Sequence, residues 1–259
     1  MGAFLASPSF AQQVRFDVKD VNHRVAQKFK RDFAARATAL KQYFDATNFV
    51  APFAGAIKVK VHAYSPPTSH ALLPAWDGHR GQMEFAASRA KDGKAAILHE
   101  LAHVHAPNQA RFLTEGYSIY LEELIGNIQA YPTFGDSIEK ATKALNASAL
   151  SAVKMDLFDA VSTQHDHEIG NSVGLETALP GAPNTPAASD RLTYAYLISG
   201  SFVKYLINGY GLSKFKTLYE LSPLTPGVAT PTDPTRYQNV YGNSLAQLET
   251  EWRNWFATQ

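Results

Sequence analysis

The chain contains the pentapeptide His-Glu-Leu-Ala-His at residues 99–103, with two histidines four positions apart. On an α-helix, residues four apart lie above one another on the same face, so His99 and His103 can direct two imidazoles at one point. Zinc takes such nitrogen ligands in a tetrahedral site, and a catalytic site leaves one position open for water. Glu100 can then reach that water as a general base without binding the metal. The pentapeptide therefore predicts a helix that carries a zinc site.

The surrounding sequence favours a buried helix over residues 94–105. Asp92 is a candidate N-cap, no Pro or Gly interrupts the stretch, and Pro107 follows it. The alternative is that the two histidines are hydrogen-bonded core residues and that Glu100 lies on the surface. Three ionisable groups within five residues of an apolar helix would be costly without a compensating charge, which favours the metal site.

A third protein ligand is predicted on a second helix, from about residue 108 to about residue 126. Glu115 follows His103 by twelve positions, which allows a tight turn and about one helical turn before the carboxylate points back. Gly116 has no side chain, which allows two helices to come close at this position. Glu122 faces the same way as Glu115 and is a candidate to orient a ligand imidazole through a hydrogen bond. The alternative for Glu115 is an ordinary carboxylate on the helix surface.

The run HELAH followed by FLTEGYSIYLE resembles the gluzincin metallopeptidases, in which a Glu-Gly pair on the next helix supplies the third ligand. The likeness is closest to the peptidase MA-like branch, whose pattern the chain matches at Phe112-Leu113, Glu115-Gly116, Ser118, Tyr120 and Glu122. Residues 196–211 and 244–252 are similar to a tyrosine-containing helix and a closing helix of that branch. The likeness runs from about residue 80 to the end of the chain, and the first 80 residues are unmatched.

This resemblance implies a zinc-dependent metallopeptidase with one zinc ion per chain and a peptide or protein substrate. His99, His103 and Glu115 would hold the metal, and Glu100 would activate the zinc-bound water that hydrolyses the peptide bond. The tetrahedral intermediate of the hydrolysis needs a further hydrogen-bond donor beside the metal. Tyr196 is the first candidate, because it matches the position of the tyrosine in the related helix, and Tyr194 is a rival. Two alternatives are an inactive zinc-binding relative that acts as a binding module and a zinc hydrolase of a non-peptide bond.

Two further motifs contain side chains that could contact a substrate. Residues 81–85, Gly-Gln-Met-Glu-Phe, are similar to the G-x-M-E-N signature of aminopeptidase N-like gluzincins, but Phe85 stands in place of Asn. We expect this segment to be the edge strand along which an extended substrate pairs, and we leave Glu84 out of the site. We expect the cluster His-Asp-His-Glu at residues 165–168 to form a solvated loop; the alternatives are that it supplies a histidine that stabilises the intermediate or that it lines a substrate cleft.

The sequence predicts an α+β fold with a small mixed sheet, and the resemblance to gluzincins implies that this fold is zincin-like. Residues 1–18 are assigned to a signal-peptide remnant or a flexible N-terminus, residues 19–107 to an α/β subdomain that ends in the zinc helix, and residues 108–259 to a helical subdomain that carries the third ligand. The periodicity predicts helices over 21–46, 137–145, 191–208, 212–220 and 245–258, and strands over 57–63 and 81–87.

Composition excludes several classes of protein and partner. A net charge of +1 is too small to attract nucleic acid or an anionic membrane electrostatically, and no apolar run approaches the length of a membrane span. The chain has no cysteine, which excludes disulfides and thiolate metal sites.

Ser9-Phe10-Ala11 is similar to a signal-peptide cleavage site, so we expect export to the periplasm or the exterior, or otherwise a cytoplasmic protein.

Overall fold

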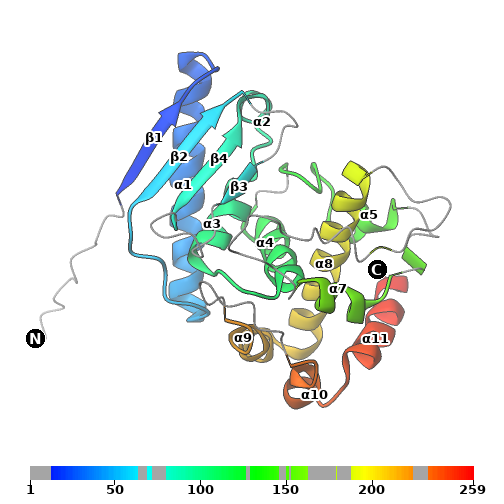
Figure 1. Ribbon diagram of the computed structural model, residues 1–259. Coiled ribbons are helices and arrows are strands. Elements are labelled where there is room, and N and C mark those ends of the chain that lie inside the picture. Colours follow the sequence, from blue (N-terminus) through cyan, green and yellow to red (C-terminus); the bar gives the residue numbers. More distant parts are fainter. Residues whose placement is uncertain are drawn as a thin grey trace, which may run out of the picture.

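The computed structural model describes residues 13–63, 69–71, 80–126, 129–145, 150–151, 153–162, 179, 188–223 and 233–259. The strands in these ranges are β1 (Val14–Val18), β2 (Ile57–His62), β3 (Ser69–Ala71) and β4 (Gln82–Ala86). The helices are α1 (His23–Thr47), α2 (Ala87–Asp92), α3 (Ile97–His105), α4 (Arg111–Ile125), α5 (Ile138–Lys143), α7 (Met155–Ser162), α8 (Ala188–Tyr210), α9 (Leu212–Glu220), α10 (Arg236–Tyr241) and α11 (Leu245–Ala257). The strands lie at one end of the molecule and α7 to α11 at the other, with α4 between them (Figure 1).

The four strands form one mixed sheet in the order β1-β2-β4-β3. β1, β2 and β4 are parallel, and β3 is antiparallel to β4. Helix α1 covers one face of the sheet (Figure 1), where the rings of Phe16 and Phe33 lie 5.4 Å apart and those of Phe29 and Phe85 lie 5.3 Å apart. Side chains of alternate residues point to opposite faces of a strand, so polar residues such as Lys60 lie on the other, exposed face.

The strand predicted over residues 81–87 is present as β4, but the prediction that it lies at the edge of the sheet is wrong. β3 pairs with the outer side of β4 and makes it an inner strand. β3 is only three residues long, too short to show a readable alternation of polar and apolar residues. Glu84 lies on the polar face of β4, where Lys60 Nζ is 2.9 Å and His62 Nε2 is 3.1 Å from its carboxylate.

β1 was not predicted, and it begins within the stretch assigned to a leader or a flexible N-terminus. Its sequence Val-Arg-Phe-Asp-Val alternates with a period of two, and its residues pair in register with β2 from Val14 opposite Ile57 to Val18 opposite Val61. The physical reason is that Phe16 packs against α1, so the strand is held by the core as well as by the sheet. Residues 14–18 of the stretch assigned to a leader or a flexible terminus are thus part of the sheet.

The helical half is built on close contact between α4 and α8. A Cβ atom added at Gly116 of α4 would lie 2.4 Å from the carbonyl oxygen of Ser199 in α8. A Cβ atom added at Gly200 of α8 would lie 2.9 Å from Cγ2 of Ile119 in α4. The two helices therefore meet through a glycine on each side, which confirms the expectation that Gly116 allows two helices to approach.

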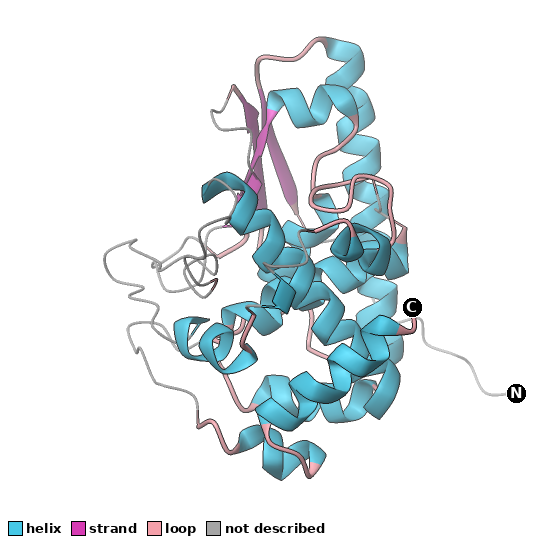
Figure 2. Ribbon diagram, turned by 90° about the vertical axis from the view of Figure 1, so that its right-hand side faces the viewer, coloured by secondary structure: helices cyan, strands magenta, loops and turns pink. Residues whose placement is uncertain are grey.

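The observed organisation confirms the mixed α+β expectation, with the strands confined to one part of the molecule (Figure 2). The helices predicted over 21–46, 137–145, 191–208, 212–220 and 245–258 correspond to α1, α5, α8, α9 and α11. Helices α2, α7 and α10 were not predicted; α2 and α10 have six residues each, too few for a clear helical period. Among the described helices, none combines the length and apolar character needed to cross a lipid bilayer.

Candidate metal centre

Helix α3 carries the His-Glu-Leu-Ala-His motif, and every residue of the helix is buried. The helix begins at Ile97, three residues later than predicted, and Ala96 at its N-cap makes no side-chain hydrogen bond to it. Asp92 is the last residue of α2 and not the N-cap of α3, because Gly93 ends α2 in a left-handed conformation with φ of 70°. Residues 94–96 then connect the two helices.

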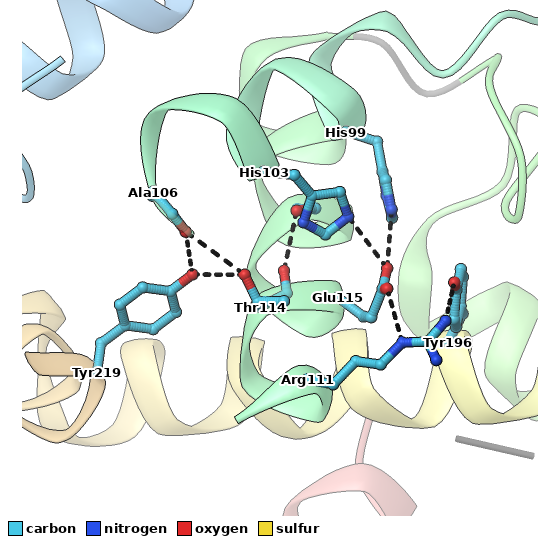
Figure 3. Close-up of polar contacts among 9 residues, drawn as sticks. His99, His103, Ala106, Arg111, Thr114, Glu115, Tyr196 and Tyr219 are labelled. Carbon is cyan, nitrogen blue, oxygen red and sulfur yellow. Dashed lines mark hydrogen bonds and ion pairs between the residues drawn. The ribbon is translucent and has the colours of Figure 1, made fainter. Parts of the chain in front are cut away.

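Three side chains converge beside α3 in the arrangement that the sequence predicted. His99 Nε2 lies 2.9 Å and His103 Nε2 lies 3.3 Å from the same carboxylate oxygen, Oε2 of Glu115 (Figure 3). The ligand atoms of His99, His103 and Glu115 all lie within 4.8 Å of one another, and all three residues are buried. Two histidines from one helix and a glutamate from the next therefore form a compact group that could hold a metal ion.

The buried carboxylate and imidazoles perturb one another's protonation. Burial alone would lower the pKa of His103, but the adjacent Glu115 and, more weakly, Glu100 raise it above its ordinary value. Burial would raise the pKa of Glu115, but His103 and His99 hold it well below its ordinary value. Glu115 is therefore ionised at neutral pH, the state in which a carboxylate binds a cation. Glu100 follows His99 directly on α3, and only 3% of the residue is exposed.

The turn between α3 and α4 is fixed by α9. The Tyr219 hydroxyl donates to the carbonyl oxygen of Ala106 at 2.6 Å and lies 2.6 Å from Thr114 Oγ1 (Figure 3). Asn108 Nδ2 donates to the carbonyl oxygen of Tyr219 at 2.6 Å, and its Oδ1 accepts from the backbone N–H of Ala110 at 2.8 Å. These bonds join the end of α3 to the start of α4 and so set where Glu115 lies relative to the two histidines.

Arg111 is a site residue that the sequence analysis missed. Its Nε lies 3.3 Å from Glu115 Oε1, and its Nη2 donates to the Tyr196 hydroxyl oxygen at 3.4 Å (Figure 3). Its side chain is 18% exposed. A signal was present in the sequence, because Arg111 and Glu115 are four residues apart on one helix, a spacing that brings opposite charges together.

Of the two candidate tyrosines, Tyr196 lies at the cluster. Its ring stacks on that of His99, with centroids 5.8 Å apart and an angle of 20° between the planes. Burial is the main cause that raises the pKa of Tyr196 well above its ordinary value, so the phenol is a neutral donor at neutral pH. Tyr194 is partly buried against the core. Within the described part of the chain, no hydrogen bond or ring contact joins Tyr194 to the three candidate ligands.

The remaining candidates are placed as follows. Glu122 is buried in α4, but the Nδ1 atoms of His99 and His103 have no hydrogen-bond partner among the described residues, so Glu122 does not bind either of them there. His105 points away from the cluster, as expected, and its Nδ1 accepts the backbone N–H of Phe53 at 3.0 Å. The His-Asp-His-Glu cluster at 165–168 lies outside the described residues.

Comparisons with protein-family models, with curated protein sequences and with solved structures give no match to this chain. The site is therefore interpreted from its own geometry and chemistry.

Proposed function

We propose that this chain is a zinc-dependent metallopeptidase of the gluzincin type, with a zincin-like fold and one zinc ion per chain. The observation that carries the proposal is the convergence of His99 Nε2 and His103 Nε2 on one oxygen of Glu115 in a buried setting. One carboxylate and two imidazoles thus direct their metal-binding atoms at one point. A divalent cation binds such a set of donors.

The donor set fits zinc. Zinc binds histidine nitrogen and carboxylate oxygen at about 2.0–2.2 Å, which puts the ligand atoms of a tetrahedral site roughly 3.3 Å apart. The distances of 2.9 and 3.3 Å from Glu115 Oε2 to the two imidazole nitrogens are close to that separation. Three protein ligands leave a fourth position, as catalytic zinc sites require. The absence of cysteine leaves nitrogen and oxygen as the ligands, which suits a hydrolytic site.

Each side chain then has a defined role. Zinc, when bound, supplies a Lewis acid that lowers the pKa of water and polarises a carbonyl group. Glu100 accepts the proton of the attacking water and passes it to the nitrogen of the leaving amine. Tyr196, a neutral phenol beside His99, donates its hydrogen to the oxygen on which negative charge develops. A peptide bond is the proposed target because the sequence resembles the gluzincin peptidases in these same positions.

Metal content tests the proposal first. Elemental analysis of the purified protein is expected to give about one zinc per chain, with little or none in His99→Ala and Glu115→Ala. His105→Asn is the matched control: it removes a histidine of the same helix that faces away from the cluster, while the Asn oxygen can still accept the Phe53 N–H. A protein that binds no zinc, even after zinc is added, would contradict the proposed site.

Turnover of a peptide library tests the reaction. Glu100→Gln is expected to retain zinc and to lose most activity, because the amide cannot accept the proton. Tyr196→Phe is expected to lower kcat, whereas Tyr194→Phe, a matched change two residues away, is expected to leave it near the wild-type value. Full activity of Glu100→Gln would contradict the assignment of the base, and zinc-dependent hydrolysis of esters but of no peptide would contradict the substrate class.

A further inference from the structure

The two oxygens of the Glu115 carboxylate have different surroundings. Oε2 faces the nitrogens of His99 and His103, and Oε1 faces Nε of Arg111 at 3.3 Å. A carboxylate with both oxygens free could bind a metal ion through either or through both. Because Oε1 is engaged by a guanidinium, Glu115 presents a single oxygen on the side where the histidines meet.

The same guanidinium also acts on Tyr196. Arg111 Nη2 donates to the tyrosine hydroxyl oxygen at 3.4 Å. A phenol has one hydrogen to donate, and its oxygen can also accept. Arginine has no acceptor, so the hydrogen of Tyr196 cannot point at Arg111 and remains available for another acceptor. The stacking of the tyrosine ring on His99 keeps the hydroxyl near the first candidate ligand.

We infer that Arg111 is a positioning residue that holds Glu115 as a single-oxygen ligand and, through the same guanidinium, orients the hydroxyl of Tyr196 for donation. The inference rests on the proposed zinc site. Arginine suits this task because its planar fork carries donors in fixed directions, whereas lysine offers one point charge that cannot keep both contacts in the same geometry. The link makes zinc affinity and turnover depend on one side chain that contacts neither the metal nor the substrate.

An ordinary ion pair that only stabilises α4 is the competing explanation, and the helical half provides a matched control. Arg253 and Glu249 of α11 also form a pair four residues apart, at 2.8 Å from Nη2 to Oε1. Arg111→Met and Arg253→Met each remove an arginine from such a pair. If Arg111 only stabilised its helix, both changes would lower the thermal midpoint and neither would alter zinc binding.

Zinc affinity, measured by competition with a chromophoric chelator, is the first readout. We expect Arg111→Met to weaken zinc binding by about 10–100-fold, the usual effect of losing a group that holds a metal ligand. The released carboxylate can turn away from the histidines, which weakens metal binding. Arg253→Met is expected to bind zinc like the wild type. Wild-type zinc affinity in a folded Arg111→Met would overturn the inference while leaving the zinc site intact.

Turnover at saturating zinc is the second readout, with Tyr196→Phe as the partner change. If Arg111 acts through Tyr196, kcat of the double variant should be no lower than that of Arg111→Met alone. If the losses of kcat in the two single variants multiply in the double variant, the link between the two residues would be overturned.

Should Arg111→Met fail to fold, Arg111→Lys is the alternative variant, because it keeps the charge. It is expected to show intermediate zinc affinity and reduced kcat, and wild-type values for both would overturn the inference. A wild-type protein without zinc would instead overturn the proposed function itself.

Discussion

The hydroxyl of Tyr219 donates a hydrogen bond of 2.6 Å to the carbonyl oxygen of Ala106, the residue that ends α3. Tyr219 belongs to α9, more than one hundred residues further along the chain than the helix it binds. Because the same hydroxyl also contacts Thr114, the residue before Glu115, one side chain of α9 fixes both ends of the turn that joins the two ligand-bearing helices.

Tyr219→Phe tests this relationship. The change leaves the Ala106 carbonyl oxygen and the Thr114 hydroxyl with only their long mutual contact of 3.5 Å, which should lower the free energy of unfolding by about 0.5–1.5 kcal/mol. Because the turn sets the position of Glu115, zinc affinity should fall by roughly tenfold. Tyr241→Phe is the matched control, since the buried Tyr241 hydroxyl has no hydrogen-bond partner among the described residues and its loss should be nearly neutral. Equal effects of both changes in urea unfolding would contradict the role of the bond.

Gly116→Ala is expected to separate α4 from α8. The added Cβ would lie 2.4 Å from a backbone oxygen of Ser199, a clash that no side-chain rotation relieves, and we expect a loss of about 1–3 kcal/mol in stability. Gly209→Ala, in α8, is the control. Its Cβ would meet nothing closer than 3.7 Å, so alanine should raise stability by about 0.5–1 kcal/mol. Thermal unfolding of the two variants should therefore shift in opposite directions.

The metal-binding group could be predicted because the sequence signals for it lie within two neighbouring helices. The spacing of His99 and His103 on one helix, and the Glu-Gly pair on the next, specify which side chains can meet without knowledge of the sheet. Arg111 shows the limit of that reasoning. Its pairing with Glu115 follows from the spacing of four residues, but its contact with Tyr196 joins two helices that are 85 positions apart in sequence and could not be inferred from local periodicity.

The sheet was predicted less well for a related reason. β2 and β4 alternate clearly, whereas β3 has three residues and β1 lies next to an apolar segment similar to a leader. The order of strands depends on which edges pair in space, and the sequence contains no local signal for that choice. The role of α9 in holding the α3–α4 turn was missed on the same ground, because Tyr219 is far from the motif in sequence.

A fall in pH should weaken the hydrogen bonds by which Glu251 attaches α11 to the end of α8. Tyr205 and Asn243 donate to its carboxylate at 2.7 and 2.8 Å, and Tyr210 donates as well. The tyrosine hydrogen bonds lower the pKa of Glu251 below its ordinary value. A lowered folded-state pKa means that the stabilisation is complete above the ordinary pKa and is lost as pH falls through the folded value.

Glu251→Gln should therefore cost about 1 kcal/mol at pH 7, a modest value because the site is close to solvent, and less near pH 3. Urea unfolding of both proteins at the two pH values measures the difference. Glu220→Gln, an exposed glutamate paired with Lys216 on one helix, is the control and should show little change at either pH. A cost for Glu251→Gln that is the same at pH 3 and pH 7 would contradict the assignment to the ionised carboxylate.

Removing the metal should destabilise the fold if the proposed site is correct. A ligand that binds only the folded state stabilises it by about 2.7 kcal/mol at a free concentration 100 times its Kd. For a chain of 259 residues this corresponds to a rise of roughly 5–10 °C in Tm when zinc is added to the chelated protein. His99→Ala should show little of this rise and His105→Asn should show all of it. A full rise in His99→Ala would mean that zinc binds elsewhere, because one imidazole and one carboxylate alone cannot make the site that the geometry of α3 and α4 provides.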